Sequence, residues 1–81
     1  MKVRVRFFGG PREALGRNES EQQLPAGATA GDLVNLLGEE YPVLGPYCRV
    51  MKVAVNRKYA SLESQLHEGD EVALIPPVGG G

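Results

Sequence analysis

The sequence predicts a single α+β domain in which one main helix packs against a mixed β-sheet. The first residues alternate between apolar and polar side chains with the period of a strand, and residues 29 to 41 have the apolar spacing of a helix. Two later segments, residues 50 to 56 and 71 to 75, have strand composition again. A chain of 81 residues buries only about 60 to 65% of the surface that it exposes when unfolded, so one modest core must stabilise the fold.

Strict alternation from Lys2 to Phe8 predicts a half-buried strand. Its apolar side carries Val3, Val5 and Phe7, and its other side carries Lys2, Arg4, Arg6 and Phe8. The tripeptide Gly9-Gly10-Pro11 is expected to stop this strand. A weaker extended segment from Glu19 to Leu24 follows, and the short gap between the two segments favours a hairpin-like return.

Residues 29 to 41 predict the one strong helix of the chain. Thr29 is a good N-cap, and Asp32 stands three residues later in place of the usual capping-box Glu. The apolar stripe has i, i+3, i+4 and i+8 spacing and consists of Leu33, Leu36, Leu37 and Tyr41. Pro42 disfavours a helical conformation in the residue before it, so the helix is expected to end near Tyr41 and to cover a sheet.

The second half of the chain predicts further strands. Val43 to Tyr47 contains Gly45-Pro46 and is expected to form a loop. A strand is predicted from Val50 to Asn56, with one face formed by Met51, Val53 and Val55 and the other by Lys52 and Ala54. His67 to Asp70 predicts a tight turn. The last strand, Glu71 to Ile75, is expected to point Val72 and Leu74 into the core.

The order of these elements is two strands, a helix and then more strands, with the helix crossing between strands that can pair in parallel at the sheet centre. This is the layout of a β-grasp, or ubiquitin-like, domain with a mixed sheet of about four to five strands on one main helix. We expect residues 1 to 75 to form this domain and residues 76 to 81 to form an extended C-terminal tail.

Composition excludes several classes of function. Nine Lys and Arg against ten Asp and Glu give a formal charge of −1, which removes the global cationic field of a general nucleic-acid binder. One Cys and one His cannot supply an ordinary zinc site or an internal disulfide, so no metal is expected. No apolar run approaches the length of a membrane span, and charged residues interrupt the N-terminal segment, which does not fit the apolar core of a signal peptide. The expected location is the cytoplasm.

The end of the chain is its most informative stretch. Two prolines cannot continue a central strand, so a projecting tail that enters a partner's cleft is expected from Pro76, Pro77, Val78, Gly79 and Gly80. Glycine lacks Cβ and can pass through a narrow channel, with the Gly81 carboxylate as the reactive group. Because a free carboxylate is a poor electrophile, an ATP-dependent partner must first convert it to an acyl-adenylate. The plain alternative is a frayed glycine tail without a function.

Three stretches carry a family resemblance. They are the run Phe7 to Gly16, the dipeptide Val55-Asn56, and the run Leu66 to Gly81 with Gly-Asp-Glu-Val, Pro-Pro-Val and a Gly-Gly end. On these residues the chain resembles the MoaD-type small subunits of molybdopterin synthase, within the MoaD and ThiS family of ubiquitin-like sulfur carriers. In that family the first run includes a helical turn with Arg12 and Glu13. The chain departs at Gly9, where Ala is frequent, and at Gly79, where Ser, Thr or Ala is usual.

The resemblance implies a cycle of sulfur delivery. An adenylating enzyme activates the Gly81 carboxylate with ATP, and sulfur from a donor such as a cysteine desulfurase or a rhodanese-like protein replaces AMP to give a thiocarboxylate. The charged tail then enters a large catalytic subunit and delivers sulfur to cyclic pyranopterin monophosphate. The chain itself is then a substrate subunit of a heteromeric synthase, not an enzyme alone, and it binds no cofactor; ATP belongs to the activating partner.

Phe8 is the second feature of interest, because alternation places it on the polar side of the first strand with Arg6. An outward aromatic residue in a basic setting favours a docking face for the large subunit. Small and apolar contacts from neighbouring strands are expected to extend this face through Ala54, Ala73 and Ile75. The alternative is a lone exposed Phe, which is ordinary in a soluble protein.

The remaining candidate residues give weaker indications of function. Basic residues could contact nucleic acid, but the first strand lacks the clustered aromatics of an RNA-binding sheet, so neither nucleic acid nor a membrane is expected as a partner. Cys48, with no His near it in the sequence and in a transition from loop to strand, is expected to be a small apolar filler and not the sulfur carrier. His67 with Asp70 and a serine matches a hydrolase triad by type only; a solvated turn is favoured. No phosphate-binding glycine motif occurs.

Three rivals to the synthase role stay open. One is a sulfur carrier for thiamine synthesis or for tRNA thiolation. The Phe-Phe pair of the first strand and the Pro-Pro-Val run near the C-terminus argue against this role. Another is a ubiquitin-like protein modifier, in which a lysine amine attacks the activated Gly81. The third, a plain interaction domain, requires no chemistry at the tail.

Overall fold

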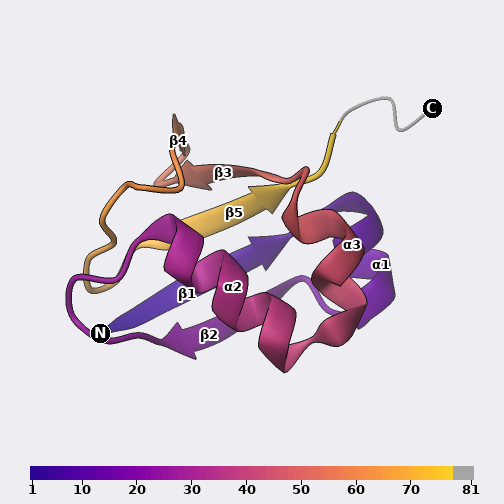
Figure 1. The fold of residues 1–81 in the computed structure, drawn as a ribbon, viewed down its shortest axis with the longest axis horizontal. Helices are drawn as coiled ribbons and strands as arrows, with labels where there is room; N and C mark the ends of the chain where they lie inside the picture. Colours follow the sequence, from indigo (N-terminus) through magenta and orange to yellow (C-terminus); the bar gives the residue numbers. More distant parts are fainter. Residues whose placement is uncertain (78–81) are drawn as a thin grey trace.

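The structure, a computed structural model, describes residues 1 to 77 (Figure 1). Along the chain the elements are β1 Lys2–Phe7, α1 Gly9–Leu15, β2 Glu19–Gln23, α2 Ala30–Glu40, η1 Pro42–Leu44, α3 Gly45–Cys48, β3 Lys52–Val55, β4 Lys58–Ala60 and β5 Glu71–Ile75. Within this part of the chain, no helix combines the length and the hydrophobicity needed to cross a membrane.

The strands form one mixed sheet in the order β2-β1-β5-β3-β4, and α2 lies across one of its faces (Figure 1). The central strands β1 and β5 pair in parallel, whereas the other neighbouring strands pair antiparallel. This confirms the predicted α+β class and the parallel pair at the sheet centre. Parallel strands need a crossover connection, and the chain between β1 and β5 provides one because it includes α2, which crosses the sheet.

The hydrophobic core lies between the sheet and α2. Its members come from every part of the described chain; among the most deeply buried are Val3, Val5, Phe7, Leu33, Leu37, Leu44, Leu66, Val72 and Leu74. The alternation predicted for the first strand is confirmed, because β1 buries every second side chain as far as Phe7. Leu66, outside any strand, is held by a hydrogen bond from its N–H to the Ala28 carbonyl at 2.9 Å.

The predicted hairpin-like return after the first strand is only partly right. β1 and β2 do pair antiparallel, but the helix α1 occupies the connection, where Gly9-Gly10-Pro11 had indicated only a stop. Pro11 is compatible with a first helical turn because the N–H that it lacks has no partner there. Gly16 ends α1 in the left-handed conformation, with φ of 71° and its N–H bonded to the Arg12 carbonyl. The helical turn implied by the family resemblance is present.

The main helix agrees closely with its prediction. Thr29 caps α2, and the capping box is complete: the Asp32 N–H donates to Thr29 Oγ1 at 3.2 Å, and the Thr29 N–H donates to Asp32 Oδ2 at 2.9 Å. The helix ends at Glu40, and Tyr41 forms its C-cap directly before Pro42. Two donors that an uncapped helix leaves without partners are therefore satisfied at this N-terminus.

The loop predicted from Val43 to Tyr47 is wrong, because η1 and α3 occupy this stretch. Pro42 and Pro46 each stand in the first turn of one of these short helices, where proline is well tolerated. Leu44 is fully buried and anchors the pair of helices to the core. Proline therefore starts these helices, whereas the prediction had read it only as a helix breaker.

The strand predicted from Val50 to Asn56 forms over Lys52–Val55, and a short strand that the residue pattern did not indicate follows it. That strand, β4, has three residues and lies at the edge of the sheet. Asn56 and Arg57 connect the two strands with positive φ of 50° and 72°. Two consecutive left-handed residues suit a tight hairpin, although glycine more often supplies the second of them.

Candidate docking surface and tail root

The sheet face that is not covered by α2 carries an apolar hollow, which we call the docking surface. It has a volume of about 460 Å³ and is lined by Phe8, Ala54, Arg57, Tyr59, Ala73 and Ile75. Four of the five residues predicted for a docking face are therefore among its lining. Arg6, the fifth, lies beside it, with its guanidinium 5.8 Å from the centre of the Phe8 ring.

Strand register explains why these residues meet. Arg6 pairs with Ala73, Ala73 with Ala54, and Ala54 with Tyr59, so one row of side chains crosses four strands on the same face. The two alanines in the middle of the row are short, which leaves a floor between taller side chains at both ends. Ala54 points to this face as predicted but is only 7% exposed, because its neighbours stand over it.

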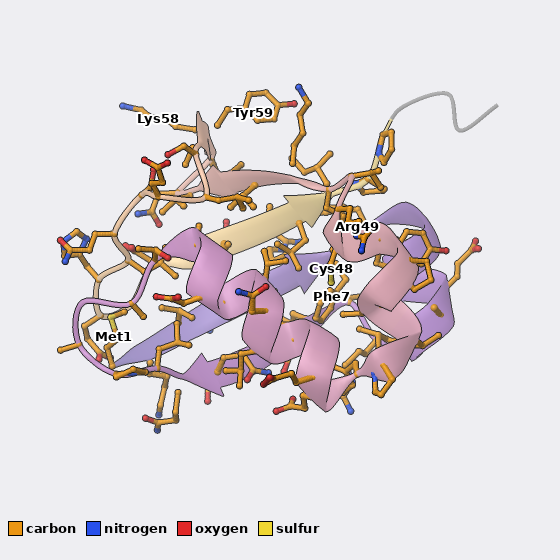
Figure 2. All side chains as sticks on the ribbon, in the orientation of Figure 1. Met1, Phe7, Cys48, Arg49, Lys58 and Tyr59 are labelled. Carbon is orange, nitrogen blue, oxygen red and sulfur yellow. The ribbon has the colours of Figure 1, made fainter. Side chains whose placement is uncertain are left out.

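Phe8 and Tyr59 form the tall walls of the docking surface. Phe8 is 38% exposed and Tyr59 is 74% exposed, although both are large and apolar for most of their area. Figure 2 shows Tyr59 projecting outward from β4. Exposed aromatic side chains around a small apolar floor are typical of the centre of a protein interface.

Arg6 is held in place from two sides. Its Nη1 lies 3.9 Å from Glu71 Oε2, and its guanidinium stands over the Phe8 ring. Each contact is exposed and contributes only about 0 to 1 kcal/mol to stability. Their joint effect is to keep a positive charge at the rim next to Phe8, and Arg57 adds a second cation to the lining.

Tyr59 was missed by the sequence analysis, and Arg57 was not predicted for the docking face. The sequence could have indicated Tyr59 only if the turn before it had been recognised. Once Asn56 and Arg57 form a two-residue hairpin connection, the register requires Tyr59 to pair with Ala54. The residue pattern of Lys58 to Ala60 alone is too short to show an alternation.

The docking surface continues to the root of the predicted tail. A second hollow of about 300 Å³ is lined by Lys52, Tyr59, Ile75, Pro76 and Pro77, and it shares Tyr59 and Ile75 with the first. Pro76 is half-buried and Pro77 is exposed. The remaining predicted tail and reactive residues, Val78, Gly79, Gly80 and Gly81, lie outside the described residues.

The other candidate residues are dispersed. Cys48 is the last residue of α3, not part of a loop as expected; it is half-buried, and its Sγ lies 3.9 Å from the Val34 carbonyl. His67 Nδ1 lies 3.9 Å from Asp70 Oδ2, and no hydrogen bond among the described residues joins this pair to a serine. Residues 1 to 77 contain no cluster of three or more His, Cys, Asp or Glu that could hold a metal.

A mixed sheet in this order, covered on one face by α2 and carrying an apolar hollow on the other, defines a ubiquitin-like β-grasp protein. The likeness extends to an ubiquitin from Caldiarchaeum subterraneum, with a TM-score of 0.67 at 16% identity, covering 100% of this chain and 98% of that one. The chain belongs to the ThiS family, whose model matches residues 5–81. The family assignment made from the sequence is confirmed.

Two relatives match the chain from end to end. A molybdopterin synthase sulfur carrier subunit from Mycobacterium tuberculosis is 42% identical, over 100% of this chain and 99% of its own length. A protein of the same description from Chlamydomonas reinhardtii is 35% identical, with 100% of both chains covered.

Two solved structures are similar over their full length. SAMP1 from Haloferax volcanii, a small archaeal modifier protein, has a TM-score of 0.86 and 28% identity, with 100% of both chains covered. A subunit in the complex of subunits 1 and 2 of the molybdopterin-converting factor from Helicobacter pylori has a TM-score of 0.73 and 29% identity, again with 100% of both covered.

Proposed function

We propose that this chain is the sulfur-carrier subunit of a molybdopterin synthase. The observation that carries the proposal is the end-to-end match, at 42% identity, to the Mycobacterium tuberculosis protein of that description. The exposed docking surface beside the tail root supports it, because a carrier must bind partners next to the group that it delivers.

The chemistry takes place at Gly81. A carboxylate oxygen of Gly81 attacks ATP in an adenylating enzyme, and pyrophosphate leaves to give an acyl-adenylate. The terminal sulfur of a persulfide on a donor protein, such as a cysteine desulfurase or a rhodanese-like protein, then displaces AMP to give an acyl disulfide. A thiol attacks the donor's sulfur in that disulfide, forms a new disulfide with it and releases the thiocarboxylate. The thiocarboxylate sulfur forms a bond to cyclic pyranopterin monophosphate, and water then cleaves the resulting thioester. The sulfur stays on the pterin, and the regenerated carboxylate returns for another round.

The two parts of the chain divide this work. Residues 1 to 75 form the domain that docks, and residues 76 to 81 form the tail that brings Gly81 to the reacting group. The large hollows described above are open and apolar, with no paired acid and base at their floor. In this proposal the catalytic groups and the nucleotide site belong to the partners, and this chain acts as the sulfur-donating subunit, not as an enzyme alone.

The docking surface is proposed to receive the large synthase subunit. The floor, Ala54 and Ala73, admits an apolar side chain of the partner, while Phe8 and Ile75 pack around it. Arg6 at the rim selects an acidic partner group. The Helicobacter pylori relative has been seen as a complex of subunits 1 and 2. Neither nucleic acid nor a membrane is required.

Mass spectrometry tests the chemistry directly. The purified chain is incubated with ATP, sulfide and the adenylating enzyme of its own organism, and the intact mass is measured. Replacement of one terminal oxygen by sulfur is expected, and the product must then yield molybdopterin when the large subunit and cyclic pyranopterin monophosphate are added. Sulfur loading without molybdopterin would favour another sulfur-carrier pathway and would contradict the synthase role.

A second candidate function is favoured by the likeness to SAMP1, a small archaeal modifier protein. In that role a lysine amine displaces AMP from Gly81 and forms an isopeptide bond. Digestion of cellular proteins followed by a search for Gly81 attached to lysine distinguishes it from the carrier role.

A further inference from the structure

The hairpin that carries Tyr59 has little structure of its own to hold it in place. β4 consists of three residues, lies at the edge of the sheet and pairs only with β3. So short a ladder gives little stability by itself, and burial adds little more because the Tyr59 side chain is 74% exposed. The two turn residues, Asn56 and Arg57, have positive φ, which non-glycine residues rarely adopt. Another interaction must therefore fix the hairpin.

The Asn56 side chain supplies this interaction by binding the start of β5. Its Nδ2 donates to Asp70 Oδ1 at 2.9 Å, and its Oδ1 accepts from the Glu71 N–H at 3.0 Å. The Asn56 N–H also donates to the Glu71 carbonyl at 2.8 Å. The Asp70 carboxylate is itself held, because its Oδ2 accepts from the His67 N–H at 2.8 Å. Both ends of the Asn56 carboxamide are thus bound to a fixed part of the chain.

The same part of the chain also holds the opposite wall of the docking surface. Phe8 directly follows β1, and β1 pairs with β5 over four residues. Glu71 Oε2 lies 3.9 Å from Arg6 Nη1, and the Arg6 guanidinium lies 5.8 Å from the centre of the Phe8 ring. The hydrogen bonds of Asn56 therefore fix the Tyr59 wall relative to the strand that already holds the Phe8 wall.

We infer that Asn56 is a positioning residue for docking of the large synthase subunit, acting through Tyr59. This inference rests on the proposed function. A partner that packs between Phe8 and Tyr59 needs both side chains at a fixed separation, and a hairpin that is already held spares the cost of ordering it during binding. Loss of the Asn56 side-chain bonds therefore weakens binding, although every side chain that lines the docking surface is unchanged.

The test reverses the polarity of the bond between Asn56 and Asp70. Asn56→Asp alone places a second carboxylate against Asp70, so the two groups repel and the bond is lost. Asp tolerates positive φ much as Asn does, so the backbone of the turn is kept. Adding Asp70→Asn restores the match, because the new amide donates to the new carboxylate and still accepts from the His67 N–H. The Glu71 N–H keeps an acceptor at position 56 throughout.

Calorimetric titration with the large subunit measures the affinity, at a temperature at which circular dichroism shows every variant to be folded. Asn56→Asp is expected to weaken binding about 3- to 10-fold, the cost of ordering an aromatic side chain on binding. The double variant Asn56→Asp with Asp70→Asn is expected to bind like the wild type. Wild-type affinity in Asn56→Asp, or no recovery in the double variant, would overturn the inference.

Two further variants separate positioning from a general loss of stability. Thr29→Ala removes the N-cap of α2, which lies on the other face of the sheet, and is expected to destabilise the fold without a change in affinity. An equal loss of affinity in Thr29→Ala would show a general effect and refute the role of Asn56. In a Tyr59→Ala background, Asn56→Asp is expected to cost no further affinity, whereas losses that multiply would contradict action through Tyr59.

Nuclear Overhauser contacts between the Tyr59 ring and the Ala54 methyl group give a readout that needs no partner, because these two residues pair across β3 and β4. The contacts are expected to weaken in Asn56→Asp and to return in the double variant. Contacts that stay unchanged in Asn56→Asp refute the inference. If the contacts change as expected but the wild-type chain does not bind the large subunit, the proposed function alone is refuted.

Discussion

The side-chain amide of Asn56 donates a hydrogen bond of 2.9 Å to Oδ1 of Asp70, which joins the β3–β4 turn to the turn that precedes β5. The same Asn56 side chain accepts a bond of 3.0 Å from the Glu71 N–H, and the Asn56 N–H donates to the Glu71 carbonyl at 2.8 Å. Asp70 in turn accepts from the His67 N–H at 2.8 Å. The hairpin that presents Tyr59 is therefore tied to the sheet centre by its first turn residue.

Replacing Asn56 with Ala is expected to destabilise the fold by about 1 to 3 kcal/mol, because two side-chain hydrogen bonds are lost and Ala tolerates the positive φ poorly. Asn56→Gly separates the two causes, since glycine accepts this φ but makes no side-chain bond. Urea unfolding followed by circular dichroism measures both variants. A midpoint for Asn56→Gly equal to that of the wild type would show that the bonds to Asp70 and Glu71 contribute nothing.

Replacing Phe8 with Asp is expected to weaken binding of the large subunit by about 10- to 100-fold while the fold is retained, because Phe8 is an outward wall of the docking surface. Calorimetric titration with the large subunit measures the affinity. Val43→Asp is the matched control, since Val43 is an exposed apolar residue of η1 outside the hollow. Identical affinities for the two variants would remove Phe8 from the interface.

Replacing Tyr59 with Ala is expected to leave the unfolding midpoint nearly unchanged, because its side chain is 74% exposed. Binding of the large subunit is expected to weaken by about tenfold or more, since Tyr59 lines both the docking surface and the hollow at the tail root. Surface plasmon resonance gives the affinity and the dissociation rate. A large loss of stability with unchanged affinity would assign Tyr59 to the fold and not to the interface.

Deleting Gly81 is expected to abolish sulfur loading, because the Gly80 carboxylate of the shortened tail stops about 3.4 Å short of the place that the Gly81 carboxylate reaches. The thermal midpoint is expected to stay unchanged, because the described core ends at Leu74. Intact mass after incubation with ATP, sulfide and the adenylating enzyme measures loading. Gly79→Ala, which keeps the terminal Gly80-Gly81, is the control and is expected to load. Sulfur loading of the shortened chain would contradict the proposed chemistry.

The sequence predicted best those elements whose side chains alternate or repeat over several turns. The β1 strand and the capped helix α2 follow directly from such patterns, and so does the burial of Val72 and Leu74 in β5. The loop predicted around Pro42 and Pro46 was wrong, because proline ends one helix but is also favourable in the first turn of the next.

The docking surface could be predicted only in part. Phe8, Ala54, Ala73 and Ile75 follow from alternation within single strands. Tyr59 depends on the register of a three-residue edge strand, and that register depends on two non-glycine residues with positive φ. Such conformations are selected by tertiary hydrogen bonds, which for Asn56 come from Asp70 and Glu71, residues distant in the sequence.

The placement of β5 between β1 and β3 has a consequence for synthesis of the protein in the cell. A nascent or prematurely terminated chain that lacks this strand holds only two separate hairpin-like ladders, each with an open edge ready to pair with other chains. The sheet closes only once the ribosome has released residues 71 to 75. A chain that stops before residue 71 is therefore expected to lack both the closed sheet and the docking surface, because Ala73 and Ile75 of β5 are part of its lining.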